Sequence, residues 1–508
     1  MLSVFDHGGP PPCPAPFNLA AHVLGRAPTL GARTALSVVH DDAAQNWSYS
    51  ELEAAVRGTG TGLLRAGLAP GDIALMRLGN SVDFPIAYLG AIAVGVIPVP
   101  TSAQLTADEV GALIADLKPA VVLRDPSVAS LKAPSGPREI GLEDLAAMRS
   151  LPACGYDLGD PNRMAYVVYT SGTSGKPRAV AHAHRAIWAR QMMMTGWYGL
   201  TAQDRLLHAG AFNWTYTLGT GLMDPWTMGA TALIPAAGTP IAELPVRLRQ
   251  HRATIFAAAP GVYRRMLNQN DSFELPDLRH GLSAGEKLSE TLRATWRQVT
   301  GREVYEAFGM SECSTFISAC PNRPAPPGRL GTPQPGRRIA IVDDSGPVPR
   351  GAPGVIAVDH RDPGLMLTYL NAPDEMAARM RDGWFLTGDQ GVMEDDDQIT
   401  YLGRADDMMN AGGYRVSPLE VEAALSACPG LDQIAVAEVE VKNDTHIIVG
   451  FYTAQAPLDV GTLKSFAAEH LARYKQPRDY VALNSLPAGA NGKVLRRALP
   501  ALYPRKPR

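Results

Sequence analysis

The sequence predicts an α/β protein with a large, multi-subdomain N-terminal α/β domain of mostly parallel sheets and a small, mobile C-terminal α+β domain. Apolar strand-like segments at residues 73–76 and 96–99 flank an apolar helical segment at 87–93. This alternation is typical of parallel βαβ units. A chain of 508 residues is too long for one ordinary domain. After about residue 404 the alternation gives way to a compact unit of about a hundred residues.

Local signals support both domains. Ser50 and Glu53 have capping-box spacing and open a helix expected to run toward Leu64. In the C-terminal unit, Ser417 and Pro418 form a helix start with a capping serine and proline at the first helical position. We expect its other elements, two strands and a helix, at residues 434–441, 446–452 and 462–473. The predicted domains are residues 1–404 and 405–508.

Composition excludes several classes of function. Hydrophobic residues make up 46% of the chain and charged residues 19%, which describes a folded globular protein. The formal charge of −3 gives no electrostatic reason to bind nucleic acid or an anionic membrane. No apolar stretch is long enough for membrane insertion, and no signal-peptide pattern opens the chain. The five cysteines lack CxxC spacing, so we expect free thiols and a cytoplasmic location.

A glycine-rich loop follows the apolar strand at residues 166–168. It comprises Thr170, Ser171, Gly172, Thr173, Ser174, Gly175 and Lys176. Glycines allow close backbone approach, hydroxyls supply donors and the lysine adds positive charge, which together suit a polyphosphate. The loop is not a Walker loop, because Thr170 stands where that motif has its first glycine and Pro177 follows the lysine. A plain polar surface loop is the alternative, disfavoured by the preceding strand and the lysine.

The loop resembles the signature of the adenylate-forming superfamily, which includes acyl-CoA synthetases, peptide-synthetase adenylation domains and luciferases. Four further segments match that family in order: Tyr-Glu-Ala-Phe-Gly-Met-Ser-Glu at 305–312, Gly-Trp-Phe-Leu-Thr-Gly-Asp at 383–389, Gly-Arg-Ala-Asp-Asp at 403–407 and Asn-Gly-Lys at 491–493. One such motif is weak, whereas five in order are specific. The resemblance implies an enzyme that activates a carboxylic acid with ATP as an acyl-adenylate, then transfers the acyl group to a thiol, with CoA as the expected acceptor.

The resemblance also implies catalytic roles for Lys493, Glu312 and Lys176. The loop with Lys176 would hold the β- and γ-phosphates of ATP, and Glu312 would hold Mg²⁺. Ser311 would contact the α-phosphate, while Lys493 would bridge that phosphate and the acyl carboxylate. No strong general base is needed, because a carboxylic acid is already ionised at neutral pH. Catalysis instead requires charge neutralisation and alignment of two anions.

Other matched residues would enclose the nucleotide and CoA. Asp389 would accept hydrogen bonds from the ribose, and Arg404 would support the same sugar. The adenine would be framed by Ser283, Ala284, Gly285, Glu306, Ala307 and Phe308. The small domain would rotate about a hinge at Asp406, bringing Gly412 and Gly413 to the pantetheine tunnel. A non-catalytic nucleotide-binding protein would have lost some of these charged residues, and none is lost.

The acyl pocket is expected to have an apolar wall formed by Phe212, Trp214, Tyr216, Gly309 and Met310. The alternative for some of these residues is that they only pack in the hydrophobic core. Peptide-synthetase domains usually carry an aspartate in this region to pair with an α-amino group. Here Asn213 stands instead, and burying an unpaired amine is costly, so an α-amino acid is disfavoured.

Residues 17–100 and 414–422 are similar to benzoate–CoA ligases, which favours an aromatic or small apolar acid. Short- or medium-chain fatty acids, a carrier-protein acceptor and a homodimer stay open. His182 and His184 follow the loop, and without further ligands they are expected in a polar segment or a helix cap rather than at a metal.

Overall fold

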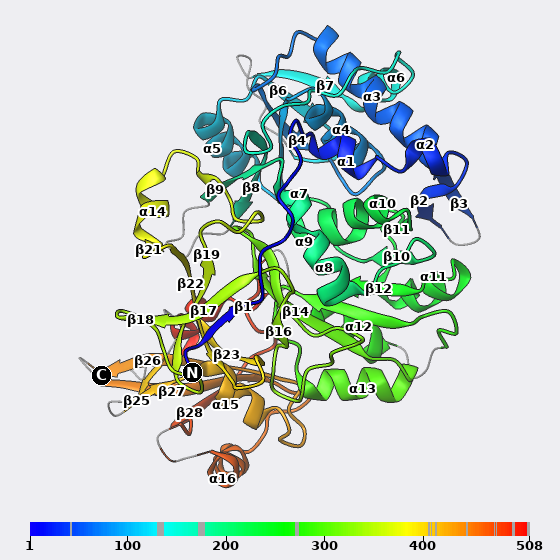
Figure 1. Cartoon of the computed structure of the whole chain (residues 1–508). Coiled ribbons are helices and arrows are strands. Elements are labelled where there is room, and N and C mark those ends of the chain that lie inside the picture. Colours follow the sequence, from blue (N-terminus) through cyan, green and yellow to red (C-terminus); the bar gives the residue numbers. More distant parts are fainter. Residues whose placement is uncertain are drawn as a thin grey trace.

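The computed structural model describes residues 1–40, 43–129, 137–170, 178–269, 274–404, 407, 409–411, 414–442, 445–471, 473, 475–489 and 493–504. Within these residues the strands form six sheets, and helices pack between and around them. The predicted α/β class is confirmed. Figure 1 shows an N-terminal lobe at the top, the central sheet below it, and the C-terminal elements at the bottom.

The N-terminal lobe is built on a parallel sheet of order β5-β4-β6-β7. These strands span Ile97–Pro100, Ile73–Arg77, Val121–Arg124 and Arg138–Gly141. Helices α3, α4, α5 and α6 span Tyr49–Arg65, Asp83–Ala93, Ala107–Leu117 and Leu142–Met148. The predicted cap of α3 at Ser50 is wrong. Ser48 has the same spacing to Glu51, and these two residues cap the helix reciprocally, at 3.2 and 2.7 Å.

The central sheet has nine strands in the order β16-β15-β14-β13-β12-β10-β11-β2-β3. In chain order they span Thr34–Val39, Ala44–Ser48, Arg205–His208, Thr231–Pro235, Ile255–Ala258, His280–Ala284, Val304–Met310, Ser314–Ser318 and Thr332–Pro333. The strands from β14 to β2 are parallel, and the edge strands are antiparallel. Ligands of open α/β sheets bind beyond the carboxyl ends of such strands.

Short and medium helices connect the central strands. Helices α9, α10, α11, α12 and α13 span Thr215–Leu218, Asp224–Met228, Leu244–Gln250, Pro260–Gln269 and Glu290–Thr300. Upstream lie α1, α2, α7 and α8 at Leu19–Val23, Ala27–Leu30, Ala186–Ala189 and Gln191–Met193, and the π-helical turns span Met194–Tyr198 and Gly219–Met223. A single 3₁₀ turn at Ile241–Glu243 leads into α11.

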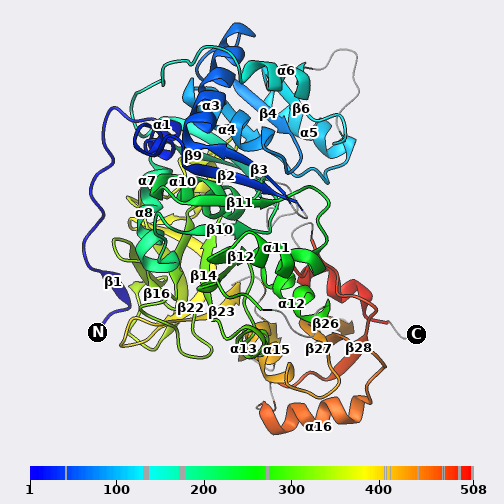
Figure 2. The same ribbon diagram turned by 90° about the vertical axis from the view of Figure 1, so that its right-hand side faces the viewer.

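A seven-stranded antiparallel sheet lies beside the central one. Its strands β1, β17, β18, β19, β21, β22 and β23 span Val4–Asp6, Arg338–Asp343, Gly346–Pro347, Pro353–Asp359, Met380–Arg381, Trp384–Met393 and Ile399–Arg404. Strand β1 pairs with β17, with Phe5 opposite Ile339. In Figure 2 the N-terminal segment runs along the outside of the molecule from β1 to α1. The βαβ alternation did not predict this sheet.

A small antiparallel sheet, β20-β9-β8, carries the loop predicted to bind phosphate. Strands β8 (Met164–Thr170) and β9 (Arg178–Ala183) flank that loop, and β20 (Thr368–Tyr369) pairs with β9. Helix α14 follows at Pro373–Ala378. The sheet therefore brings Tyr369, distant in sequence, beside the loop strands.

The C-terminal elements form an α+β unit with a hydrophobic core of its own. Its strands β24 to β28 span Met409–Ala411, Tyr414–Val416, Gln433–Lys442, Thr445–Thr453 and Asp479–Ala482. Helices α15 and α16 and a 3₁₀ helix span Pro418–Leu425, Val460–His470 and Arg496–Leu502. Ser417 caps α15 as expected, whereas α16 ends at His470 rather than near Arg473. The domain boundary near residue 404 stays a prediction.

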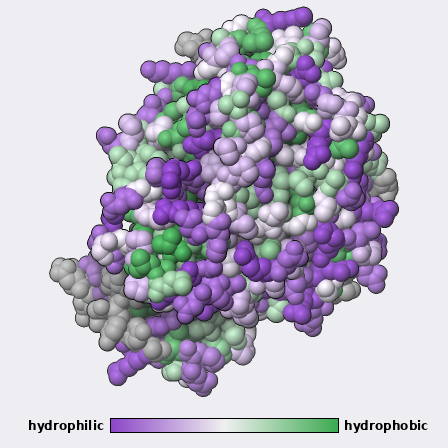
Figure 3. Space-filling model, viewed as in Figure 1, coloured by the Kyte–Doolittle hydropathy of each residue, from purple (hydrophilic) through white to green (hydrophobic). Residues whose placement is uncertain are grey.

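The surface is mixed in character. On the face shown in Figure 3, hydrophilic residues are interspersed with small groups of hydrophobic ones. Among the helices that the structure describes, none is both long enough and apolar enough to traverse a bilayer.

Candidate active site

The strands that flank the predicted phosphate loop are paired in register. Thr170, the last residue of β8, lies opposite Arg178, the first residue of β9. The rest of the loop, Ser171, Gly172, Thr173, Ser174, Gly175 and Lys176, lies outside the described residues, so its phosphate-binding role stays a prediction. The hinge at Asp406 and the tunnel glycines Gly412 and Gly413 also lie outside them.

Glu312 is a buried carboxylate just beyond the end of β14, 7% exposed. It accepts a 2.6 Å hydrogen bond from the phenol of Tyr369. Burial and the negative charge of Glu312 raise the pKa of Tyr369, which keeps the phenol protonated as a donor. Arg178 lies over the Tyr369 ring at 5.5 Å and forms an ion pair with Glu375. A cation, an aromatic ring and a carboxylate therefore form one contiguous group beside the loop strands.

Sequence reasoning missed Tyr369 and Arg178. Nothing in the sequence near Tyr369 links it to Glu312, because the contact depends on the pairing of β20 with β9. Arg178 carries a weak signal, since it is the second cation of the segment that leaves the loop.

Asp389 and Arg404 meet on neighbouring strands, β22 and β23, where they are paired in register. The Asp389 carboxylate is 6% exposed and accepts a 2.7 Å hydrogen bond from the Tyr401 phenol. Burial raises the pKa of Asp389, and the charge of Arg404 and the Tyr401 hydrogen bond act in the opposite direction. The two residues predicted to hold the ribose are thus close together.

Lys493 approaches this group from the C-terminal unit. Burial raises the pKa of both Asp389 and Glu286, and the positive charge of Lys493 opposes that rise in both carboxyls. The ammonium group therefore lies within electrostatic range of two carboxylates contributed by separate sheets of the large domain. Residues from distant parts of the chain therefore converge on one place.

The segments predicted to frame the adenine lie at the carboxyl ends of β13 and β14. Ser283 and Ala284 end β13, and Gly285 follows with φ of 95°. A Cβ on Gly285 would lie 2.5 Å from the indole of Trp214, so glycine is required on both steric and conformational grounds. Glycine here lets Trp214 lie directly against the backbone.

Ala307 and Phe308 continue this frame on β14 beside Glu306. The Glu306 carboxylate is 1% exposed and is engaged by Lys287 Nζ at 2.9 Å and by the backbone N–H of Leu288 at 2.8 Å. Its side chain fixes the turn after β13, so only its backbone remains for a nucleotide contact.

The predicted acyl wall is partly core. Phe212 and Tyr216 are buried, and the Tyr216 phenol donates to the carbonyl of Leu282 at 3.0 Å. Trp214 is half-buried at the start of α9. Gly309 and Met310 pair with β15 across a bulge, where a Cβ on Gly309 would lie 2.2 Å from the carbonyl oxygen of Ser314.

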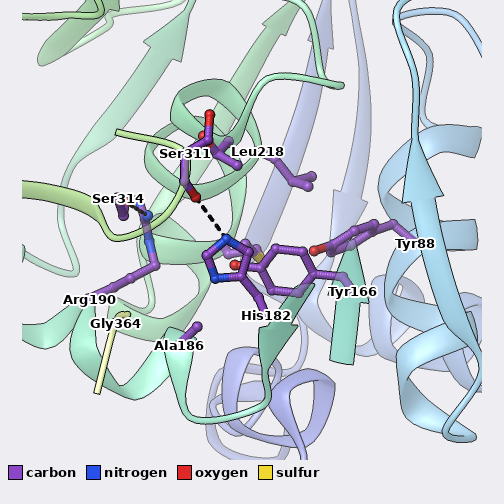
Figure 4. Close-up of a pocket in the computed structure, with 11 residues that line it drawn as sticks. Tyr88, Tyr166, His182, Ala186, Arg190, Leu218, Ser311, Ser314 and Gly364 are labelled. Atoms are coloured by element: carbon purple, nitrogen blue, oxygen red, sulfur yellow. Dashed lines mark hydrogen bonds between the residues drawn. The ribbon is translucent and has the colours of Figure 1, made fainter. Parts of the chain in front are cut away.

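A cavity of ≈ 20 Å³ lies beside α9 and the turn after β14 (Figure 4). It is lined by Tyr88, Tyr166, His182, Ala186, Arg190, Thr215, Leu218, Met223, Ser311, Ser314 and Gly364. Thr215 and Ser311 are sequence neighbours of the predicted wall, but the five predicted wall residues do not line this cavity. Their role in binding the acid stays a prediction.

His182 and His184 are not in a polar segment or a helix cap. Both are buried on and just after β9, at 2% and 1% exposure. His184 Nδ1 accepts a 3.0 Å hydrogen bond from the backbone N–H of Leu19, and His182 Nε2 contacts the carbonyl of Ser311 at 2.8 Å. Each therefore ties β9 to a different part of the large domain. No group of three or more potential metal-ligating side chains occurs in the described part of the chain.

Comparisons with known proteins agree with this geometry. The sequence matches the AMP-binding enzyme family over residues 26–370 and the AMP-binding enzyme C-terminal domain over residues 420–493. It is 30% identical over 512 residues to the 3-hydroxybenzoate–CoA ligase of Aromatoleum sp. (strain CIB), covering 94% of this chain and 95% of that protein.

Two further relatives give similar coverage. The chain is 30% identical over 524 residues to the benzoate–CoA ligase of Thauera aromatica, covering 97% of this chain and 98% of that protein. The solved structure of a benzoate CoA ligase from Burkholderia xenovorans LB400 superposes with a TM-score of 0.83 at 26% identity, covering 96% of this chain and all of that one.

The five ordered motifs, the convergence of Asp389, Arg404 and Lys493, and a family match across most of the sequence lead to the same assignment. The resemblance inferred from the motifs is confirmed. The chain belongs to the AMP-binding enzyme family, with its C-terminal domain matched as well.

Proposed function

We propose that the protein is an ATP-dependent ligase that joins an aromatic carboxylic acid to CoA through an acyl-adenylate. The observation that carries the proposal is the approach of Lys493, from the C-terminal unit, to Asp389 and Glu286 of the large domain. The aromatic acid is supported by the two curated relatives, which act on 3-hydroxybenzoate and benzoate.

In the first half-reaction a carboxylate oxygen attacks the α-phosphorus of ATP and pyrophosphate leaves. Both reactants are anionic, so the main barrier terms are repulsion and alignment. Arg404 and Lys493 place positive charge beside Asp389, which would offset that repulsion, and Arg178 supplies a further positive charge at the loop strands. Ser311, next to Glu312, offers a hydroxyl for the α-phosphate.

Glu312 would hold Mg²⁺. The donor set suits this ion, which is usually bound through one or two carboxylates while substrate phosphates and water complete its shell. Glu312 provides a buried, oriented carboxylate without a cluster of competing ligands among the described residues. Bound Mg²⁺ would supply charge neutralisation on the phosphates, and Tyr369 holds the Glu312 carboxylate in place.

In the second half-reaction the thiol of CoA attacks the acyl carbonyl and AMP leaves. This step needs access to a carbonyl that Lys493 approaches during adenylation, so we propose that the C-terminal unit rotates about Asp406 between the two steps. Gly412 and Gly413 would then line the path of the pantetheine arm. A cytoplasmic location fits the use of ATP and CoA, and a homodimer remains part of the proposal to be measured.

The test is an assay of the purified protein with ATP, Mg²⁺, CoA and a panel of aryl, cyclic and alkyl acids. Acid-dependent pyrophosphate release and CoA thioester formation should both be highest with an aryl acid. The Glu312→Gln variant, which keeps the shape but loses the charge, should lose pyrophosphate release. Turnover only with alkyl acids, or acyl transfer only to a phosphopantetheinylated carrier protein, would contradict the proposal.

A further inference from the structure

One face of strand β9 supports the two consecutive residues proposed to contact the α-phosphate and Mg²⁺, Ser311 and Glu312. Arg178 and His182 lie four positions apart on β9, so their side chains point to the same face of the strand. Arg178 lies over the ring of Tyr369, whose phenol bonds to Glu312. His182 contacts the backbone of Ser311 directly. A single strand therefore supports both residues of the turn between β14 and β15.

The contact between His182 and Ser311 is short and buried. Nε2 of His182 lies 2.8 Å from the carbonyl oxygen of Ser311, and Figure 4 shows the ring directed at that oxygen. A carbonyl oxygen can only accept, so Nε2 carries a proton and donates. The His182 side chain lies in the protein interior, where burial lowers its pKa to about 4, so the ring is neutral at physiological pH. The contact therefore selects one of the two neutral tautomers of the imidazole.

The direction of the imidazole is fixed by packing. Tyr166, which lies opposite His182 in the pairing of β8 with β9, stacks on the ring with centroids 4.9 Å apart and an interplanar angle of 16°. Val180, on the same face of β9, belongs to one hydrophobic cluster with Cys313 of the turn. Packing on the ring and along the strand thus orients the Nε2–H group toward Ser311, as a positioning side chain requires.

Other elements hold the rest of the turn. The backbone N–H of Met366 donates to the carbonyl of Glu312 at 2.7 Å. Ser314, which follows the turn, has a φ of 62°, an uncommon conformation for a residue other than glycine. Nη1 of Arg190 donates to the Ser314 hydroxyl at 2.6 Å. Within this set, His182 is the contact that joins the Ser311 end of the turn to the strand leaving the phosphate loop.

We infer that His182 is a positioning residue for adenylation, which holds the Ser311 carbonyl so that the Ser311 hydroxyl and the Glu312 carboxylate keep a constant spacing from the phosphate loop. The inference rests on the proposed function, which assigns these groups to the α-phosphate and Mg²⁺. Strand β9 begins at Arg178, two residues after Lys176, so the spacing is set by one strand. A misplacement of about 1 Å in such an arrangement can cost about a hundredfold in rate.

The experiment replaces His182 with two side chains of similar length. In His182→Gln the amide N–H can still donate to Ser311, whereas in His182→Met no donor remains. With saturating aryl acid and Mg²⁺, we expect His182→Met to lower kcat/KM for ATP in pyrophosphate release by about tenfold to a hundredfold. His182→Gln should recover most of that loss. The affinity for MgATP, measured by calorimetry without the acid, should fall in His182→Met and recover in His182→Gln as well.

His184→Met is the matched control for loss of a buried histidine. His184 follows β9 directly and accepts a 3.0 Å hydrogen bond from the backbone N–H of Leu19, which lies outside the turn. Its replacement should lower the melting temperature about as much as His182→Met does, while kcat/KM for ATP and the affinity for MgATP change little. Equal kinetic losses in His182→Met and His184→Met, or no recovery in His182→Gln, would overturn the inference.

Nitrogen NMR of the unmodified protein with labelled histidine gives a second readout that does not require His182→Met to fold. The signal of His182, assigned by its loss in His182→Gln, should show a protonated Nε2 and an unprotonated Nδ1 at pH 7. The opposite tautomer would overturn the inference. If the unmodified protein released pyrophosphate with an aryl acid and neither His182 variant changed the kinetics, the inference would fail and the proposed function would stand. If no aryl acid led to pyrophosphate release, the proposed function itself would fail and the inference with it.

Discussion

The phenol of Tyr369, on β20, donates a 2.6 Å hydrogen bond to the carboxylate of Glu312, which lies in the turn between β14 and β15 of another sheet. Glu312 is 7% exposed, so loss of this donor would leave a buried acceptor short of a partner. We expect Tyr369→Phe to lower the free energy of unfolding by about 1.5–3 kcal/mol, measured by urea denaturation. The matched control is Tyr503→Phe, whose phenol bonds to the more accessible Asp479 at 2.8 Å and should cost less. Equal losses in the two variants would show that burial of Glu312 adds nothing.

Lys493 provides a test that separates the half-reactions. Lys493→Ala should lower acid-dependent pyrophosphate release by about a hundredfold or more, as expected for removing a charge aimed at the transition state. Thioester formation from supplied acyl-adenylate and CoA should be largely preserved, because we propose that this step follows rotation of the C-terminal unit. Lys464→Ala, an exposed position on α16, is the control for loss of a lysine in the same unit. A similar loss in both half-reactions would contradict the proposal that the C-terminal unit rotates between the two steps.

The ion pair between Arg190 and Asp224 should dominate local stability. Side-chain exposures are 7% and 0%, and removing one partner leaves an uncompensated buried charge. We expect Arg190→Met to lower the free energy of unfolding by about 3–5 kcal/mol, and the double variant with Asp224→Asn to lose less than the sum of the single losses. Arg252→Met, which disrupts the exposed pair with Asp277, should cost about 1 kcal/mol or less. If the double variant lost as much stability as the two single variants together, Arg190 and Asp224 would not be energetically coupled.

Four buried histidines predict sensitivity to mild acid. Burial lowers the pKa to about 4 for His182 and His280, and to about 3 for His184 and His208. As pH falls below about 6.5 the unfolded chain takes up protons that the folded chain does not, so stability is lost from there down to about pH 4. Each such histidine contributes a slope of about 1.4 kcal/mol per pH unit.

The measurement is the free energy of unfolding between pH 7.5 and pH 5, which should change little above about pH 6.5 and fall below it. His208 is the best residue to replace, because neither of its ring nitrogens has a partner in the described residues. His208→Leu should reduce the slope of the unfolding free energy against pH by the contribution of one histidine, about 1.4 kcal/mol per pH unit. If the His208→Leu variant kept the pH slope of the unmodified protein, His208 would not be a buried neutral histidine.

The sequence predicted the parts of the fold and site that local patterns encode. The capping of α15 by Ser417 and the strands around residues 73–76 and 434–441 depend on nearby residues, and all are present. The predicted cap of α3 is two residues too late, because Ser48–Glu51 and Ser50–Glu53 have the same capping-box spacing, whereas the helix begins at Tyr49 directly after Ser48. Contacts between distant segments were beyond reach, as Tyr369 with Glu312 illustrates.

The contacts of His182 show the same limit in functional terms. Its spacing from His184 predicts a polar segment or helix cap, whereas in the structure it is buried against Ser311 and Tyr166, which come from other parts of the chain. In the sequence, nothing distinguishes Arg190 and Asp224 from other charged residues, whereas in the structure they form a buried ion pair. Periodicity and motif spacing carry no information about such pairings.

The pairing of β1 with β17 also has a consequence for biosynthesis. The side chain of Ser3 bonds to the carbonyl of Pro349, a partner 346 residues further along the chain. At about 5–20 residues per second, a ribosome needs on the order of tens of seconds to make the intervening polypeptide. During translation β1 must therefore wait, without its hydrogen-bonded neighbour, until β17 has been made, and during that time its edge is available to chaperones.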